Sequence, residues 1–397
     1  MNRNTRNVAM VRFGEIFLKS EPVRRDFLNK LRNNIISAFE SDGITVDVKI
    51  TRSRIIVETD SQIDPVTRLS RIFGVIDTSP IYLSGTSMDE ICYMATDLAK
   101  EHLMPFTRFA VRARRDGIND YTSQELAAEA GSRIIDAIPN LTVDLTTPQY
   151  EIFLEARKEG GFVYDTRIKG PGGLPFGTQG KAISLLSAGI DSPVAAWLMM
   201  RRGVIADFLH IDSGIYGGPD IRKNLFANLA ALSGWAPGYS LTLITLPAKA
   251  LYDQIMKISE PRYRCVLCKR IMLEVASVFA ETNKYNGIIT GDNLGQVATQ
   301  TLQNLLPISA GIHMPIYRPL IGYDKEEIIA LARIIGTFCP EPGDTSCRVL
   351  PSNPATRSDS DRIERLINAY GIRSFIPGMV KDAEIKTIKN GNWYPES

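Results

Sequence analysis

The feature that most constrains the fold is a regular alternation of apolar strands and amphipathic helices that begins at Lys181. The strand segments are short and almost wholly apolar, and they read AISLLS, VIADFLHID, LTLITLP and GIITGD. The segments with helical spacing read SPVAAWLMMRRG, DIRKNLFANLAALSG, RCVLCKRIMLEVASVFAETN, GQVATQTLQNLL and KEEIIALARIIGT. Because apolar strands that alternate with helices are buried on both faces, residues 181–397 are predicted to form an α/β domain with a doubly wound parallel sheet.

Ligands of such sheets bind beyond the carboxyl ends of the strands, where the loops 187–192, 210–214 and 291–296 are expected. The first of these loops, SAGIDS, has two interpretations. Asp191 or Ser192 can simply cap the following helix. Alternatively, the small residues Ser187, Ala188 and Gly189 let backbone N–H groups approach a phosphate, with Ser192 as a hydroxyl donor and Asp191 as a ligand of Mg²⁺. The position of the loop after the first strand of the sheet favours phosphate binding.

Residues 1–168 follow a different pattern. A helix over 22–40 lies between the strand of VAMVRFGEIFLK and the two strands of ITVDVKITRSRIIVET, which predicts a small α+β domain over residues 1–60. Residues 61–168 predict a second α/β module with helices at 88–103 and 123–138. The Gly- and Pro-rich segment 169–180 reads as a linker.

Composition excludes several classes of protein. No apolar run approaches the ~18 residues of a membrane span, and the start MNRNTRNVAM lacks the apolar region of a signal peptide. A cytoplasmic protein without a membrane partner is therefore expected. Because the formal net charge is only +2, nucleic-acid binding would have to come from a local cluster. RFAVRARRDG supplies one candidate, which can equally be a solvated strand and turn, with Arg108, Arg112, Arg114 and Arg115.

The chain has five cysteines, and an odd number points to thiol or metal chemistry rather than to structural disulfides. Cys265 and Cys268 form a CxxC on a predicted helix, one turn apart on the same face. They can be buried as small hydrophobic residues, act as a redox pair or supply half of a metal site, and no second CxxC completes such a site. Cys92 and Cys339 are expected to have no role.

Longer motifs resemble a known family. SAGIDS resembles the PP-loop, SGGxDS, of ATP pyrophosphatases, with Ala188 where glycine is usual. RFAVRARRDG with SQELAAEAGSRI is similar to a THUMP domain, an RNA-binding module. Across nearly the whole chain, landmarks in the same order resemble the tRNA 4-thiouridine synthetase (ThiI) family: FGEIFLK, LLSAGIDSPVAAWLMMRRG, TGDNLGQVATQTLQNL and YRPLIGYDKEEIIALARIIGT. The resemblance implies a ferredoxin-like domain over 1–60, a THUMP domain over 61–168 and a PP-loop ATP pyrophosphatase domain over 181–397.

The resemblance also implies the chemistry of the site. ATP and Mg²⁺ are the expected cofactors, and Asp191 and Cys347 are the expected catalytic residues. For His210 a packed strand histidine is the alternative to a ligand contact. The residues that would contact ATP are Leu185, Leu186, Ser187, Gly189, Ser192, His210, Ile211, Lys269, Gly291 and Gln300.

Bacterial members of the family often append a rhodanese domain with a persulfide cysteine, and this sequence resembles the form without one, which leaves the delivery of sulfur open. Some archaeal-type relatives hold an iron–sulfur cluster with a CxxC and a distant cysteine. By that resemblance Cys265, Cys268 and Cys347 would be ligands that leave one iron open for sulfide. A thiol-only mechanism is the alternative. Asp344, three residues before Cys347, reads as a simple turn residue.

The implied reaction is adenylation of the C4 oxygen of uridine 8 in tRNA and its replacement by sulfur, which gives 4-thiouridine. The sulfur donor would be a cysteine desulfurase persulfide or free sulfide, and sulfur supply to thiamine biosynthesis would be a second role. The sequence leaves a homodimer open. Two alternatives are another PP-loop ATP pyrophosphatase that acts on a small molecule, and a non-catalytic RNA-binding protein whose PP-loop has decayed, with Ala188 as the first sign.

Overall fold

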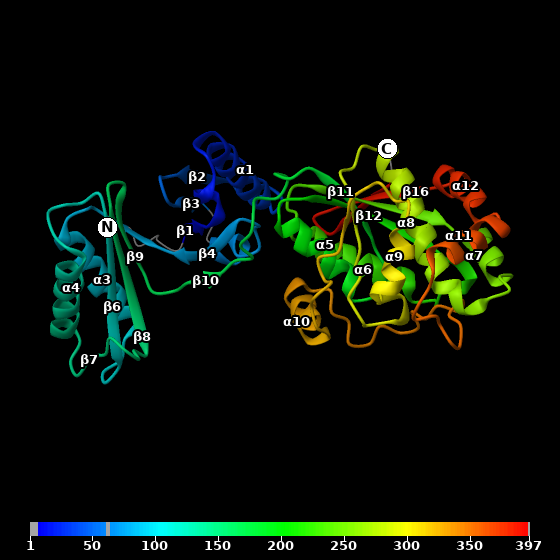
Figure 1. Ribbon diagram of the computed structural model, residues 1–397. Coiled ribbons are helices and arrows are strands. Elements are labelled where there is room, and N and C mark those ends of the chain that lie inside the picture. Colours follow the sequence, from blue (N-terminus) through cyan, green and yellow to red (C-terminus); the bar gives the residue numbers. More distant parts are fainter. Residues whose placement is uncertain (1–6, 61–63, 396–397) are drawn as a thin grey trace. The chain divides into compact units, whose positions relative to one another are not determined.

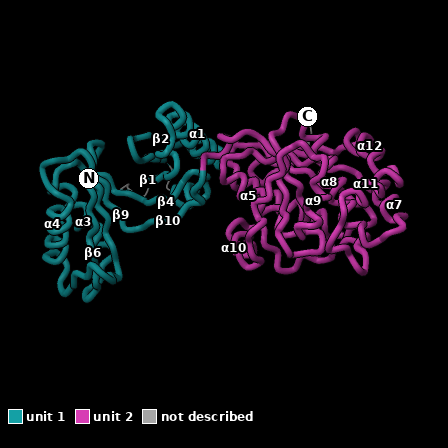
Figure 2. Tube along the Cα trace, in the orientation of Figure 1, with its two compact units in different colours: residues 1–173 teal, residues 174–397 magenta. Residues whose placement is uncertain are grey.

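The computed structural model describes residues 7–60 and 64–395, and the chain divides into two compact units, Met1–Gly173 and Leu174–Ser397 (Figure 2). The division lies within the Gly- and Pro-rich segment 169–180. The backbone N–H groups of Leu174 and Gly177 bond to the carbonyls of Arg201 and Gly203, so the second half of this segment is attached to the second unit.

The first sheet of unit 1 is antiparallel, in the order β10-β4-β1-β3-β2. The amphipathic helix α1 (Glu21–Glu40) lies where its spacing predicts and buries Leu31, Ile35 and Phe39 against the sheet. Two strands of this sheet, β4 and β10, lie beyond residue 60. The other bounds are β1 Val8–Phe13, η1 Glu15–Leu18, β2 Val46–Ile50, β3 Ile55–Thr59, α2 Pro65–Leu69, β4 Val75–Pro80 and β10 Ile168–Lys169.

The second sheet of unit 1 has the order β5-β9-β8-β6-β7, and α3 (Met88–His102) and α4 (Ser123–Ala137) pack side by side on one of its faces (Figure 1). Both helices begin at a side-chain cap. Ser87 accepts from the N–H of Glu90, and Thr122 forms a capping box with Glu125. The strands are β5 Tyr82–Ser84, β6 Arg108–Asp116, β7 Thr142–Val143, β8 Tyr150–Arg157 and β9 Gly160–Tyr164.

A buried carboxylate joins the two sheets of unit 1. Glu155 on β8 is 1% exposed and forms ion pairs with Arg54 at 3.1 Å, Arg157 at 2.8 Å and Arg12 at 3.6 Å. Burial alone would raise the pKa of Glu155, but the guanidinium groups of Arg54 and Arg157 outweigh it and lower the pKa to about 2. Tyr164 donates its hydroxyl to the same carboxylate, so both carboxylate oxygens accept hydrogen bonds.

Unit 2 contains the predicted doubly wound sheet. Its order is β15-β14-β11-β12-β13-β16-β17, and the strands from β15 to β13 are parallel. The antiparallel strands β16 and β17 extend one edge and lie in the C-terminal region, whose sequence gave no clear pattern. The strand bounds are β11 Lys181–Leu185, β12 Ile205–Asp212, β13 Ser240–Pro247, β14 Ile288–Ile289, β15 Ile316–Tyr317, β16 Glu384–Lys389 and β17 Asn392–Pro395.

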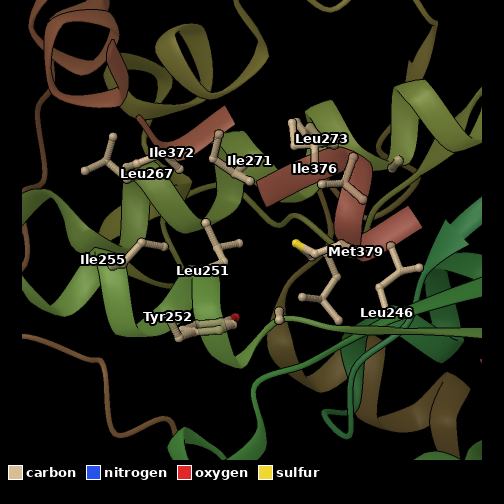
Figure 3. Close-up of a cluster of buried hydrophobic side chains, with 14 of the residues drawn as sticks. Leu246, Leu251, Tyr252, Ile255, Leu267, Ile271, Leu273, Ile372, Ile376 and Met379 are labelled. Carbon is tan, nitrogen blue, oxygen red and sulfur yellow. The ribbon is translucent and has the colours of Figure 1, made fainter. Parts of the chain in front are cut away.

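The largest core of unit 2 lies between the sheet and the helices α7, α8 and α12 (Figure 3). This core includes Leu246 of β13, Leu251 and Ile255 of α7, Ile271 of α8 and Met379 of α12. The helices α5 and α6 also contact strands of the sheet but contribute no residue to this core. Because alternate residues of a strand point to opposite faces, these two helices cover the other face of the sheet. The helices are α5 Asp191–Arg201, α6 Ile221–Ser233, α7 Lys249–Met256, α8 Arg264–Thr282, α9 Leu302–Ser309, α10 Lys325–Ile335, α11 Ser360–Ala369 and α12 Ile376–Lys381, with 3₁₀ turns η2 Gly214–Tyr216, η3 Pro261–Tyr263, η4 Ala298–Gln300 and η5 Ile372–Phe375.

The segment GQVATQTLQNLL is only partly helical, contrary to its helical spacing. Residues 295–301 form a loop with the single turn η4, and the helix α9 begins at Leu302, where Thr301 accepts from the N–H of Asn304. Gln300 and Asn304 are buried polar residues, and the carbonyl of Ala298 accepts from the Asn304 side chain. The loop is therefore held by side-chain hydrogen bonds that compete with helix formation.

Candidate active site

In the sheet of unit 2, strands are added first on one side of β11 and later on its other side, and a crevice lies at this switch point. From β11 the chain continues to β12 and β13 on one side, and β14 and β15 lie on the other. The crevice beyond the carboxyl ends of β11 and β14 is the usual ligand site of an open α/β sheet. A pocket of about 210 Å³ lies there, and its lining includes residues from both strand ends and from α8.

The bend 187–190 that joins β11 to α5 is held by its serine hydroxyls. The N–H of Ser187 donates to Oγ of Ser192 at 2.9 Å, and the N–H of Gly189 donates to Oγ of Ser187 at 3.2 Å. No side chain caps α5, whose N-cap is Ile190, so the simple interpretation of Asp191 or Ser192 as a cap does not hold. The N–H groups of the first turn are left for a ligand, which favours the phosphate interpretation.

Ala188 causes no backbone strain in this bend. Neither Ala188 nor Gly189 has a positive φ. A methyl group at 188 is therefore compatible with the conformation, and the departure from the usual PP-loop sequence removes no N–H donor.

Gly291, just beyond the end of β14, is in close contact with the bend. A Cβ atom at 291 would lie 2.8 Å from the N atom and 2.9 Å from the Cα atom of Ser192. Such contacts with backbone cannot be relieved by rotating a side chain. Glycine at this position therefore allows the strand end and the first turn of α5 to form one wall of the pocket.

Two carboxylates at the crevice are paired with cations. Asp191 accepts from Nζ of Lys325 on α10 at 2.8 Å. Asp292 is 6% exposed and accepts from Nζ of Lys269 at 2.8 Å, Nε of Arg318 at 3.2 Å and Oγ1 of Thr290 at 2.9 Å. Burial would raise the pKa of Asp292, but Lys269 outweighs it and lowers the pKa below its ordinary value.

Sequence reasoning did not identify Asp292, Arg318 or Lys325 as site residues. Asp292 follows an apolar strand in GDNLGQ, so its position offered a signal. Arg318 follows β15, a strand of two residues. Lys325 lies on α10, and only the packing of α10 beside α5 brings it to the loop.

The apolar end of the pocket is suited to a nucleobase. Leu185, Met272 and Ile308 line it together with Gln300. Oε1 of Gln300 is buried and has no hydrogen-bond partner among residues 7–60 and 64–395. An acceptor in this position matches the exocyclic amino group of adenine, so the residues present fit a bound ATP.

Three other residues expected to contact ATP, Leu186, His210 and Ile211, do not line this pocket. The side chains of Leu186 and Ile211 are 3% and 8% exposed and lie in the core, so they are not available to a ligand. Nδ1 of His210 lies 3.0 Å from the carbonyl oxygen of Leu186, and because that oxygen accepts, Nδ1 carries the proton. Burial lowers the pKa of His210, so the imidazole is neutral and Nε2 is an acceptor. His210 lines a neighbouring pocket rather than the crevice at β11 and β14.

The structure brings three cysteines into one neighbourhood. Cys265 and Cys268 lie on α8, and Cys347 forms an isolated β-bridge with Gly217. Burial, and then the neighbouring Cys347 thiol, raise the pKa of Cys265, and burial followed by Cys265 and Cys347 raises that of Cys268. No three of the described His, Cys, Asp and Glu side chains stand in a metal-binding arrangement.

The other two thiols lie in different surroundings, and Asp344 is a turn residue as expected. Cys92 is buried in the core of α3 and α4, and Cys339 is exposed. Asp344 accepts from the N–H of Ser346 at 3.0 Å and from its hydroxyl at 2.6 Å, which is the geometry of an Asx turn.

The arginine cluster of unit 1 is partly neutralised. Arg108 and Arg112 form ion pairs at 2.8 Å with Asp144 and Glu151, whereas Arg114 has no ion-pair partner in the described part of the chain. A pocket of about 440 Å³ lies on this face of β6 and β8, and its lining includes Phe153 together with Arg112 and Arg114. Arg167 lies over the Phe153 ring at 4.6 Å, and Phe153 stacks on Tyr164 with 5.2 Å between centroids. Cations over aromatic rings are typical of surfaces that bind single-stranded nucleic acid.

None of the helices within residues 7–60 and 64–395 is both long and apolar enough to cross a membrane.

Comparison with known proteins gives matches over all parts of the chain. Family models match residues 177–370 ("Thiamine biosynthesis protein (ThiI)"), 8–79 ("ThiI ferredoxin-like domain") and 85–164 ("THUMP domain"). A "Probable tRNA sulfurtransferase" of Methanobrevibacter smithii is 37% identical over 376 residues, which cover 93% of this chain and 97% of that protein. The "tRNA sulfurtransferase" of Thermoplasma volcanium is 34% identical over 96% of this chain and 78% of its own length.

A solved structure described as "Crystal structure of a 4-thiouridine synthetase - RNA complex with bound ATP" is also similar to this chain. It has a TM-score of 0.86 and 31% sequence identity, and the match covers 96% of this chain and 100% of the other.

Proposed function

Because this chain belongs to the ThiI family of tRNA sulfurtransferases, we propose that it uses ATP to convert uridine 8 of tRNA into 4-thiouridine. The observation that carries the proposal is the crevice at the switch point of the sheet, where an uncapped helix N-terminus and two paired carboxylates face an apolar slot. The same crevice argues against a PP-loop that has decayed, since its backbone geometry tolerates Ala188.

The reaction needs an activated oxygen, because oxide is a poor leaving group from a uracil. In the first step O4 of the uracil attacks the α-phosphorus of ATP, a P–O bond forms, and the bond to pyrophosphate breaks. In the second step sulfur attacks C4, the C4–O bond breaks, and AMP leaves. The electron pair returns to the AMP oxygen, so no oxidant or reductant is needed when sulfide is the donor.

The residues of the crevice suit the first step. N–H groups at the start of α5 and the ammonium groups of Lys269 and Lys325 would neutralise the charge on pyrophosphate as it departs. Asp191 would hold a Mg²⁺ ion in exchange for its ion pair with Lys325, and that ion would supply positive charge to the phosphates when bound. Gln300 would accept from the adenine amino group.

For the second step, Cys347 is the residue that we propose to carry or receive sulfur, with Cys265 and Cys268 beside it. Burial keeps the thiols of Cys265 and Cys268 protonated at neutral pH, so as free thiols they are weak nucleophiles. Cys265 and Cys268 are half-buried and Cys347 is exposed beside them, and three neighbouring thiols are suitable ligands of an iron–sulfur cluster, which would supply iron for sulfide when bound.

The alternative is a thiol-only route in which the outer sulfur of a persulfide on Cys347 attacks C4 and AMP leaves. A second thiolate, from Cys265 or from an added thiol reductant, then attacks the Cys347 sulfur, so that the S–S bond breaks and 4-thiouridine is released. The disulfide that remains is reduced by that thiol reductant.

Iron and acid-labile sulfide in anaerobically purified protein distinguish these routes. With a cluster, both are present, and both are lost from a Cys265→Ser variant but not from Cys339→Ser, since Cys339 is exposed and is not one of the three expected ligands. If wild-type protein contains neither and remains active with a persulfide donor, the cluster is excluded.

The sulfur source and the biological setting complete the proposal. A cysteine desulfurase persulfide or free sulfide would feed Cys347, and the protein would act in the cytoplasm on tRNA bound through the arginine face of β6. The description of the matching family model favours a second use of the sulfur in thiamine biosynthesis. Growth of a deletion strain without thiamine tests that use. Sedimentation of the protein with and without tRNA tests whether a homodimer forms.

The main test is thiolation of an unmodified tRNA transcript by wild-type protein and by Asp191→Asn. We expect the wild type to form 4-thiouridine with release of AMP and pyrophosphate, and the variant to lose activity while it remains folded. Unchanged thiolation by the variant would instead indicate a non-catalytic RNA-binding protein. Exchange of pyrophosphate into ATP that is indifferent to RNA would favour an enzyme that acts on a small molecule.

A further inference from the structure

A second pocket, of about 300 Å³, opens beside the ATP crevice at the carboxyl ends of β12 and β13. Its walls come from the end of β12, the glycine-rich segment 212–219, the first turns of α6 and the strand β16. It shares no lining residue with the crevice that contains Lys269 and Gln300. None of the expected ATP contacts except His210 lies in it.

The walls of this pocket connect the two catalytic loops. At one end His210 is hydrogen-bonded to the carbonyl of Leu186, the residue that precedes the PP-loop bend. At the other end Gly217 pairs with Cys347, and the N–H of Gly218 donates to the carbonyl of Ser346 at 2.9 Å. A group held in this pocket would therefore lie between the loop proposed to bind the phosphates of ATP and the loop proposed to carry sulfur. The uracil must reach both loops, because its O4 reacts with ATP and its C4 then reacts with sulfur.

Two cations of this pocket lie at one aromatic ring. The guanidinium of Arg222 and the ammonium of Lys386 lie 5.4 and 5.6 Å from the centroid of the Phe226 ring. Neither forms an ion pair in the described part of the chain, although Glu384 lines the same pocket. Two cations at one aromatic ring suit a phosphodiester next to a base.

The polar groups of the pocket also match a uridine rather than a cytidine. The neutral imidazole of His210 presents Nε2 as an acceptor, and uracil carries an N3–H donor where cytosine has an N3 lone pair. An acceptor opposite another acceptor leaves a buried group unpaired, which disfavours the wrong base. The carboxylates of Asp212 and Glu384 can accept from ribose hydroxyls.

We propose that this pocket receives the uridine to be thiolated, with its base extruded from the tRNA, its phosphates at Arg222 and Lys386, and its uracil edge toward His210. The inference rests on the proposed function and specifies where the substrate nucleotide binds. Enzymes that modify a stacked base take it out of the stack into a pocket, and a pocket between the two loops lets one base meet ATP and sulfur in turn.

The product offers a direct test, because 4-thiouridine forms cross-links to neighbouring side chains under near-ultraviolet light. Wild-type protein is mixed with its own thiolated tRNA and irradiated, and the cross-linked peptides are identified by mass spectrometry. Cross-links are expected on segment 210–226 or 384–386. Cross-links found only on other segments, such as those that contain Leu185 or Gln300, overturn the inference.

A charge-matched pair of double variants gives the second test. Arg222→Ala with Lys386→Ala is expected to lower kcat/KM for tRNA about 10- to 100-fold, with the Kd for ATP unchanged. Lys223→Ala with Lys389→Ala removes the same charge from neighbouring exposed positions outside the pocket and should change kcat/KM less than twofold. Equal losses in both pairs, or no loss in the first, contradict the inference.

The outcome for wild-type protein separates the two proposals. If the wild type forms no 4-thiouridine, the proposed function fails and the inference falls with it. If it forms 4-thiouridine but both pocket tests fail, only the position of the uridine is wrong.

Discussion

At the scale of single residues, the site depends on contacts that a sequence pattern does not show. Asp191 was expected from the PP-loop, but its partner Lys325 comes from a helix 134 residues later. Asp292 holds Lys269 through a buried hydrogen bond of 2.8 Å, so the direction of the Lys269 ammonium is fixed before ATP arrives. Preorganised cations of this kind need no rearrangement during the reaction.

Lys325→Ala is expected to lower kcat for thiolation about 100-fold, because it removes a cation beside the departing pyrophosphate. Steady-state kinetics with saturating tRNA measure the effect, and Lys325→Arg should recover part of it. Glu326→Ala, at the adjacent exposed position, is the control. A change of less than twofold in Lys325→Ala would show that Lys325 only neutralises Asp191 in the absence of ATP.

Gly291→Ala is expected to weaken ATP binding about tenfold, since its Cβ would lie 2.8 Å from the N atom of Ser192 and push the PP-loop bend aside. Equilibrium binding of a fluorescent ATP analogue measures the Kd. Gly322→Ala has open space around its Cβ and is the matched control. An unaltered Kd in Gly291→Ala would mean that the bend does not contact the nucleotide.

At the scale of elements, the strand ends and loops set where chemistry occurs, and buried polar contacts hold them there. β14 has only two residues, yet its position beside β11 creates the crevice. The loop with Cys347 has no regular structure of its own and is held by backbone bonds to the segment 216–220. In unit 1 the strand β8 carries Glu155, whose ion pairs hold together two sheets far apart in sequence.

The Glu155 network predicts a pH dependence for the stability of unit 1. The folded-state pKa of about 2 lies below the ordinary value of 4.5, so the stabilisation is complete above pH 4.5 and is lost as the pH falls from 4.5 toward 2. Glu155→Gln should cost about 3–5 kcal/mol at neutral pH, because three guanidinium groups lose a buried partner. Glu151→Gln, at a half-exposed pair, should cost much less.

Scanning calorimetry from pH 7 to pH 3 measures this effect. Trp197, Trp235 and Trp393 are the three tryptophans and all lie in unit 2, so tryptophan fluorescence follows that unit separately. A pH-independent transition for unit 1 in the wild type would contradict the prediction.

At the scale of the whole molecule, the two units divide the work. The residues around the ATP crevice and the three thiols all lie in residues 174–397, and the arginine face of β6 lies in residues 1–173. Each unit has its own hydrophobic core. ATP binding is therefore expected to need unit 2 alone, and strong tRNA binding to need both.

Residues 174–397 expressed alone should bind ATP with a Kd within about twofold of the full chain, whereas their affinity for tRNA should fall by a factor of 10 or more and lose most of its salt dependence. Nucleotide binding and filter binding of tRNA at several salt concentrations measure the two effects. A full tRNA affinity in the shortened protein would place the RNA-binding surface in unit 2.

The sequence alone determined the fold class and the family, because both depend on local information. Hydrophobic periodicity identified the helices α1, α3 and α4 and the parallel strands β11 to β14 but not β15, and the long motifs around SAGIDS and GDNLGQ identified the family. Periodicity did not identify the 3₁₀ turn η4, where buried side chains form hydrogen bonds that compete with an α-helix. It also did not identify β16 and β17, which are stabilised by strand pairing toward one edge of the sheet.

The tertiary structure decided which side chains meet. Lys325 at Asp191, Arg318 at Asp292 and Cys347 beside Cys265 are pairs separated by tens of residues, and no local pattern specifies such contacts. His210 shows the same limit, because its strand position was predictable but the pocket it lines depends on how α6 and β16 pack. A periodic pattern fixes the face that a residue occupies, and only the packing of elements fixes what lies opposite that face.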